Sequence, residues 1–191
     1  MEKENIKSVT KGIISITSMG TGYVTAAGFD EDILIEQQFL NTALHGDEVE
    51  VSLFPKIDKE RLSGEVIKIL NRVKMEFVGT VDKRKGSSVA FIIPDDKRMY
   101  MDIFLPPSES GKIKNNLKVL AQIKKWDDPK KNPEGKILKV IGKKGDNNAE
   151  MESIVLGKGF QMGFPHSVEK ESEILGKKSK PIPQKDIAER R

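Results

Sequence analysis

Hydrophobic and polar positions alternate in short stretches along most of this chain. The stretch 48–54 alternates Val and Leu with Glu and Ser, and the stretch 117–125 repeats that pattern at an offset of about 70 residues. Alternation with a period of two is the signature of a half-buried strand. Gly, Asp and Pro punctuate the gaps between such stretches. We expect strands over residues 11–17, 20–26, 32–36, 48–54, 62–70, 76–82, 88–93, 102–105, 117–125 and 135–142.

Two blocks of the sequence occur twice, in the same order. Residues 32–35 resemble 102–105, and residues 64–70 resemble 135–141, at offsets of 70 and 71. One structural unit of about that length therefore occurs twice. Five short strands per unit suit a closed or nearly closed OB barrel, because closure removes exposed strand edges. The expected fold class is all-β, with two tandem five-stranded OB barrels at 8–72 and 73–142 and a short helical and linker tail at 143–191.

The pattern changes after the second unit. A linker at 145–148 offers Asp146, Asn147 or Asn148 as the N-cap of a short helix over 150–156. We expect a second helical stretch over 166–175 and an extended linker at 177–183. The apolar side chains of this tail have no third core of their own, so they fold back on the barrels, self-associate or stay mobile. They are Ile154, Val155, Leu156, Phe160, Phe164 and Leu175.

Composition narrows the class of protein. With 191 residues, 37% hydrophobic and 32% charged, the chain has enough apolar side chains for two small cores and not for one large core. No run approaches the ~18 apolar residues of a membrane span, and the N-terminus lacks the apolar core of a secretory signal. We therefore expect a cytoplasmic protein without a membrane partner. The absence of Cys excludes disulfides, and His45 and His166 alone do not make a metal site.

Charge is distributed unevenly between the two units. Residues 1–72 carry 8 Lys and Arg against 12 Asp and Glu, whereas residues 73–142 carry 15 against 9. The basic side chains of the second unit cluster at 83–86, between its first two strands, and at 124–133, between its last two. In OB barrels these connections flank the face of strands two and three, where single-stranded nucleic acid usually lies. The second unit is therefore the better candidate for a nucleic-acid partner.

Aromatic side chains accompany these basic clusters. Bases stack on such rings for roughly 1–3 kcal/mol each, while lysines track phosphates. The alternatives are that the lysines are only solvated, and that Phe91 and Phe104 point into the core. For Trp126, a plug at the barrel mouth fits better than a stacking platform. The candidate RNA-binding residues are Tyr23, Lys83, Arg84, Lys85, Phe91, Tyr100, Phe104, Lys124, Trp126, Lys130 and Lys131.

Three ordered sets of motifs carry a resemblance. The first is Gly-Thr-Gly-Tyr-Val at 20–24, Asp-Ile-Leu-Ile at 32–35 and Ala-Leu-His-Gly-Asp-Glu-Val at 43–49. The second is Val-Gly-Thr-Val at 78–81, Phe-Ile-Ile-Pro-Asp-Asp at 91–96, Asp-Ile-Phe-Leu at 102–105 and Pro-Glu-Gly-Lys at 133–136. The third lies in the tail, at 152–156, 164–165, 182–183 and 186–191. The first two sets resemble the two cold-shock domains of the ribonuclease R and ribonuclease II family, and the third resembles the stretch that leads into its catalytic domain.

The first unit departs from the family pattern at two places. The family has a Gly-aromatic-Gly-aromatic motif there, and this chain has Thr21 at the first aromatic position, which leaves only Tyr23. Leu34 stands where cold-shock strands often offer a further ring. The resemblance therefore again favours RNA contacts on the second unit.

The resemblance implies a 3′-5′ exoribonuclease as the parent protein, with Mg²⁺ ions held by an Asp-x-x-x-Asp-x-Asp-Asp-type run. Residues 1–191 do not contain that run. We therefore expect no catalytic residue, metal site or cofactor in this chain, and Mg²⁺ only for a catalytic domain outside it. The acidic pairs at 95–96 and 127–128 lie in Pro-flanked turns and fit turn chemistry better than metal binding.

The expected function is non-specific binding of single-stranded RNA that guides it to the parent protein's own catalytic domain. A free-standing RNA chaperone would use the same face without a downstream domain. A protein-interaction module is the third possibility, which the acidic first unit favours.

Overall fold

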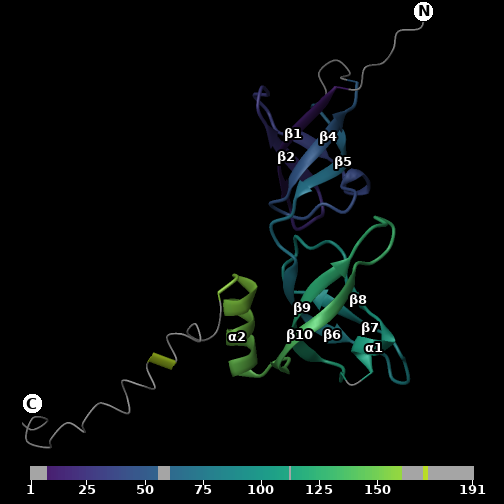
Figure 1. Cartoon of the computed structure of the whole chain (residues 1–191), viewed down its shortest axis with the longest axis vertical. Helices are drawn as coiled ribbons and strands as arrows, with labels where there is room; N and C mark the ends of the chain where they lie inside the picture. The colour runs from purple at the N-terminus through teal and green to yellow at the C-terminus, as the bar shows by residue number, and fades with distance from the viewer. Residues whose placement is uncertain (1–7, 56–60, 112, 161–169, 172–191) are drawn as a thin grey trace, which may run out of the picture.

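The computed structural model describes residues 8–55, 61–111, 113–160 and 170–171, and it shows two small β-barrels stacked along the long axis of the molecule (Figure 1). All ten expected strands are present, and the all-β fold class is confirmed. The first barrel contains β1 (Val9–Ile16), β2 (Gly22–Ala26), β3 (Ile33–Ile35), β4 (Glu48–Leu53) and β5 (Gly64–Asn71). The second contains β6 (Glu76–Asp82), β7 (Ala90–Pro94), β8 (Ile103–Leu105), β9 (Leu117–Lys125) and β10 (Glu134–Lys143).

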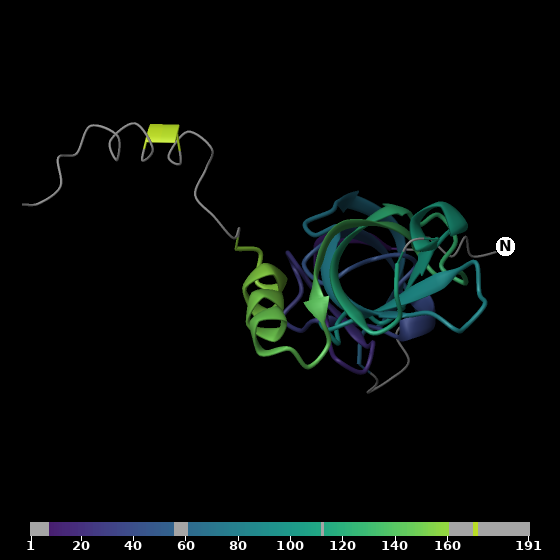
Figure 2. The ribbon, with the colours of Figure 1, turned by 90° about the horizontal axis from the view of Figure 1, so that it is seen from below.

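Both barrels use the same strand connections. The first sheet has the order β3-β2-β1-β4-β5, and a parallel bridge between Leu34 and Ser63 joins its edges. The second is a closed barrel, β10-β8-β7-β6-β9 (Figure 2). Phe104 of β8 pairs with Glu134 of β10 in parallel.

One backbone hydrogen bond shows that the repeat in the sequence is a repeat in the structure. The Leu34 N–H donates to the Leu62 carbonyl at 2.9 Å, and the Phe104 N–H donates to the Pro133 carbonyl at 2.8 Å. Leu34 and Phe104 are 70 residues apart, and Leu62 and Pro133 are 71 apart, as the offsets of the repeat require. The same contact therefore joins the third strand of each unit to the residues just before its fifth strand.

Each barrel has its own apolar core, but the two interiors meet. Leu44, which lies between β3 and β4 of the first barrel, packs in the core of the second. Tyr100 packs against both cores. The first core is formed mainly by Ile14, Ile16, Val24, Ile33, Ile35, Leu40, Val49 and Val51. The second is formed mainly by Phe77, Val81, Ile92, Ile103, Leu105, Val119, Ala121, Ile123 and Trp126.

A buried carboxylate fixes the junction between the barrels. Asp47 is fully buried, and its carboxylate accepts hydrogen bonds from the N–H groups of Leu44 at 2.9 Å and Val73 at 3.1 Å. The Arg72 guanidinium lies 3.6 Å away. Burial raises the pKa of Asp47, and the two N–H donors and Arg72 oppose that rise. These contacts join the β3–β4 connection to the segment between the barrels.

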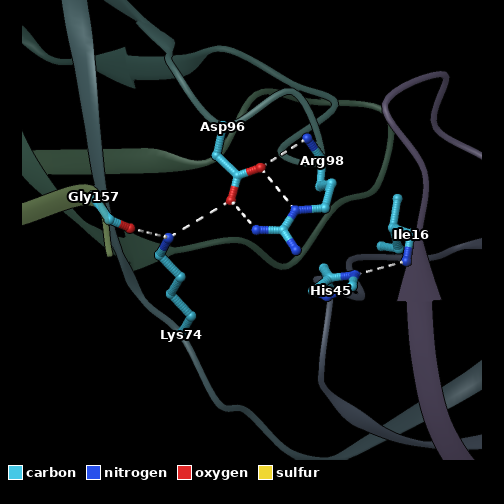
Figure 3. A network of polar contacts seen from close by, with 6 residues as sticks. All are labelled: Ile16, His45, Lys74, Asp96, Arg98 and Gly157. Carbon is cyan, nitrogen blue, oxygen red and sulfur yellow. Dashed lines mark hydrogen bonds and ion pairs between the residues drawn. The ribbon is translucent and has the colours of Figure 1, made fainter. Parts of the chain in front are cut away.

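A second polar network holds the other side of this junction (Figure 3). The Asp96 carboxylate lies 2.9 Å from the guanidinium of Arg98 and 3.7 Å from the ammonium of Lys74. Mainly through its hydrogen bond, Arg98 lowers the pKa of Asp96 to about 2. Lys74 also donates to the carbonyl of Gly157 at 3.3 Å. The network therefore connects the inter-barrel segment, the β7–β8 loop and the end of the last helix.

The last helix, α2 (Asn147–Gly157), packs outside the second barrel against β6, β9 and β10 (Figures 1 and 2). It begins three residues earlier than expected, because Asp146 caps the N–H groups of Asn148 and Ala149. Of the three arrangements considered for the apolar side chains of the tail, the structure shows α2 on the second barrel, yet Ile154 and Phe160 are 66% and 68% exposed. The expected linker at 177–183 lies outside the described residues, as does the stretch 166–175 apart from residues 170–171.

Lys118 corrects the simple alternation of β9. That pattern placed its side chain on the outer face, yet it is 5% exposed. Its ammonium lies 2.7 Å from the Asp95 carboxylate and 3.6 Å from that of Glu150, on α2. The helix covers this face of the strand, and the two carboxylates compensate the buried charge.

Two short elements were not expected, η1 (Gln37–Phe39) and α1 (Pro107–Ser110). None of the helices in the described part of the chain is both long and apolar enough to cross a membrane.

Candidate nucleic-acid interface

Two aromatic rings stand side by side on the outer face of β7 and β8. Ala90 and Ile92 are buried, and Phe91 between them is half-buried; Phe104 lies in the same way between buried neighbours on β8. Because strand side chains alternate, both rings point away from the core. Phe91 and Phe104 are directly paired across the strands, and their ring centroids are 5.7 Å apart. Of the two orientations considered, the structure shows the outward one.

The two basic connections border this ring pair on opposite sides. Phe91 pairs with Asp82, the last residue before the β6–β7 connection. Phe104 pairs with Glu134, the first residue after the β9–β10 connection. The β7–β8 face therefore lies between the two loops, as in the OB barrels on which the expectation was based.

The basic side chains of these loops differ in their availability. Arg84, Lys85, Lys124 and Lys130 are exposed, and none has a side-chain ion pair within the described ranges. Lys131 lies 3.3 Å from Asp128 but is 81% exposed, so this pair is weak. Lys83 differs, because its ammonium donates to the carbonyls of Ser110 and Ile113. Lys83 therefore stabilises the connection before β9, and its contact with a phosphate stays a prediction.

Trp126 and Tyr100 are both held by contacts within the chain, and for Trp126 this agrees with the favoured interpretation as a plug. Trp126 is 9% exposed, and its indole N–H donates to the Lys131 carbonyl at 3.0 Å. The Tyr100 ring lies 5.7 Å from it, and the Tyr100 hydroxyl donates to the Ala43 carbonyl at 3.0 Å. Trp126 thus plugs the second barrel, and Tyr100 forms part of the junction between barrels.

The first barrel has a different arrangement at the corresponding face. Tyr23 points outward from β2 and pairs with Leu34, so no second ring is present. The guanidinium of Arg61 lies 5.0 Å from the Tyr23 ring centroid. A guanidinium is planar and can itself stack on a base. Arg61 is not among the residues predicted to bind RNA. Its position before β5, which matches that of the basic connection before β10, could have indicated it.

The acidic pairs act within the protein in the way turn chemistry suggested. Asp95 and Asp96 bind Lys118 and Arg98, and Asp127 lies 3.1 Å from Lys125. Asp128 accepts a hydrogen bond from the Lys130 N–H. Within the described ranges, no three His, Asp or Glu side chains are grouped so as to hold a metal ion.

Three adjoining hollows extend from the ring pair to the junction between barrels. A hollow of about 340 Å³ contains Phe104 and Asn132 in its wall. Asn132 also lines a hollow of about 790 Å³, which we call the seam groove. A third, of about 260 Å³, shares Gln37, Tyr100 and Asp102 with the seam groove. The seam groove is lined by Glu36, Gln37, Gln38, Asn41, Tyr100, Met101, Asp102, Pro129, Lys130 and Asn132.

Comparison with known proteins agrees with this architecture. The family model described as the ribonuclease B OB domain matches residues 12–69, and a cold shock domain model matches residues 91–165. The chain resembles Mycoplasma genitalium RNase R, solved in complex with ribose methylated single-stranded RNA, at a TM-score of 0.74 and 22% identity over 90% of this chain. It also resembles yeast Ssd1, a pseudonuclease, at a TM-score of 0.68 and 20% identity over 84% of this chain. At these identities the two structures support the fold alone.

The ribonuclease R of Thermotoga maritima is 30% identical over 173 residues, which are 86% of this chain. The chain spans 23% of that relative, and 27% and 26% of the two solved chains, so it corresponds to about a quarter of each. The two domain models lie in the same order as the two barrels. The chain therefore belongs to the ribonuclease R family and carries its OB and cold-shock domains.

Proposed function

We propose that this chain binds single-stranded RNA without sequence specificity along the β7–β8 face, and that it guides RNA toward the catalytic domain of a 3′-5′ exoribonuclease. The observation that carries the proposal is the outward pair of Phe91 and Phe104, bordered by two loops with unpaired cations. Rings supply sequence-tolerant stacking, and cations follow the phosphates.

The contacts within the second barrel divide its basic side chains into those that stabilise the fold and those that are available for RNA. Lys74, Arg98 and Lys118 each lie within 4 Å of a carboxylate, so they stabilise the fold. Arg84, Lys85, Lys124 and Lys130 have no such partner among the described residues, so they remain available for phosphates. Hydrolysis is proposed to take place outside this chain, with the metal ions of the catalytic domain.

The test is to reverse the charge of the β6–β7 connection with the double variant Arg84→Glu and Lys85→Glu. Binding to a 12-nucleotide single-stranded RNA should weaken strongly. The slope of log K against log salt should become shallower by about 0.7 for each phosphate that the variant no longer binds. The matched control is Lys68→Glu with Lys158→Glu, which changes the charge equally at exposed positions on β5 and after α2.

If both double variants bind RNA equally weakly, the phosphates do not bind specifically at the β6–β7 connection, and the proposal is contradicted. An RNA chaperone would in addition separate a short RNA duplex without any other domain. A protein-interaction module would leave RNA binding weak in the unsubstituted chain and bind a protein tightly instead, which would overturn the proposal.

A further inference from the structure

The walls of the seam groove combine three kinds of surface. Met101, Pro129 and the half-buried Tyr100 supply apolar area, and Lys130 supplies an exposed cation. The remaining lining side chains are amides and carboxylates. A nucleotide in single-stranded RNA is recognised by three kinds of group. Apolar side chains contact the base ring, amides and acids bind the edge of the base, and a cation binds the phosphate.

The hydrogen bonds of the lining side chains leave acceptor oxygens free, beside the second N–H of each amide group. The Asn132 Nδ2 donates to the Asp102 carbonyl at 2.9 Å, and the Asn41 Nδ2 donates to the Val66 carbonyl at 3.4 Å. Their Oδ1 atoms remain available, because an amide oxygen accepts independently of its nitrogen. Glu36 accepts one bond, from Gln38, and keeps further acceptor capacity. Gln37 makes no side-chain hydrogen bond with any other described residue.

The Asp102 carboxylate adds to this acceptor surface. It is exposed where the β7–β8 loop ends, and it lines both the seam groove and the adjoining hollow of about 260 Å³. Two carboxylates disfavour a phosphate deep in the groove, and they favour an N–H donor. Lys130 is the one lining cation of the seam groove among the described residues.

We propose that the seam groove is a base-selective subsite, in which the carboxylates of Glu36 and Asp102 accept the two N–H groups of a nucleobase amino group and Asn132 lies beside them in the wall. Cytosine presents such an amino group at the position where uracil presents a carbonyl oxygen. A uracil oxygen that faces the carboxylates finds no hydrogen-bond donor there. Leaving such a polar group unpaired weakens binding by more free energy than a hydrogen bond at the same place would add. The subsite therefore prefers cytosine to uracil.

The position of the groove connects this subsite to the proposed RNA face. Asn132 lines both the seam groove and the hollow that contains Phe104, so the two hollows adjoin at this side chain. The groove also contains side chains from both barrels, since Gln37 belongs to η1 and Asn132 to the β9–β10 connection. The inference rests on the proposed function and adds base preference to it.

The experiment compares the affinities of C12 and U12 RNA, which have the same length and charge. Unsubstituted protein should bind C12 about five-fold more tightly, as one additional half-exposed hydrogen bond to a charged acceptor implies. The double variant Glu36→Gln and Asp102→Asn should bring this ratio close to one. The control Glu31→Gln with Glu76→Gln has the same charge change at exposed positions outside the groove, and it should keep the ratio.

A second readout uses Trp126, the single Trp of the chain, whose ring lies 5.7 Å from that of the groove-lining Tyr100. Its emission should change more with C12 than with U12, and Asp102→Asn alone should reduce that difference. If RNA binds but the C12 to U12 ratio is one, or the groove variant keeps the ratio, the inference is wrong while the proposed function stands. If neither RNA binds, both are wrong.

Discussion

Asp96 is bound by two cations from different parts of the chain, Lys74 and Arg98. Its pKa is about 2, against an ordinary value of 3.8. A carboxyl whose pKa is lower in the folded state contributes stability above its unfolded pKa and loses it as the pH falls through the folded pKa. The contribution is therefore complete at neutral pH and disappears between about pH 4 and pH 2.

We accordingly expect Asp96→Asn to lower the free energy of unfolding by about 1–2 kcal/mol at pH 7, after allowance for the exposure of Arg98. The difference from unsubstituted protein should shrink as the pH approaches 2. Urea unfolding at constant ionic strength measures it. Asp127→Asn is the control, since Asp127 and Lys125 are both mostly exposed and their pair should contribute little. An equal cost for Asp96→Asn at pH 7 and pH 2.5 would contradict the ionic origin.

At the scale of elements, α2 approaches β10 closely at one glycine. A Cβ atom built on Gly142 would lie 2.7 Å from the Cβ of Ala149 on α2, which real contacts do not allow. Gly142→Ala should therefore displace the helix while the barrels remain folded, because such overpacking costs roughly 1–3 kcal/mol. Amide hydrogen exchange across α2 should accelerate by about ten-fold. Gly157→Ala is the control: its Cβ atom would have no neighbour within 4 Å, so exchange in the rest of the helix should not change. Equal protection of α2 in both variants would show that the contact between Gly142 and Ala149 does not hold the helix.

The sequence predicted the strands well and the tertiary contacts less well. Alternation and the internal repeat were sufficient for all ten strands, because each strand has one face toward its own core. The burial of Lys118 was not predicted, because its partner on α2 is 32 residues away and no local pattern reports such a pair. The internal hydrogen bonds of Lys83 and Tyr100 were not predicted for the same reason, since their carbonyl acceptors lie far along the chain.

At the scale of the whole molecule, the barrels share a junction rather than a linker alone. Leu44 enters the second core, and Asp47 and Tyr100 bind backbone groups across the connection. Hollows adjoin one another from the Phe104 face to this junction. The central claim is therefore that one RNA path begins on the ring pair of the second barrel.

The most direct measurement is the affinity of Phe91→Ala and Phe104→Ala for single-stranded RNA across a salt series, with a thermal melt of each variant. Stacking is worth roughly 1–3 kcal/mol per base, so each variant should bind about 5- to 100-fold more weakly with an unchanged salt slope. Ile67→Ala, at an exposed position on β5 of the first barrel, is the control and should bind normally. The claim is contradicted if the ring variants bind RNA as well as Ile67→Ala does, or if they lose on the order of 3–5 kcal/mol of stability, as core rings would.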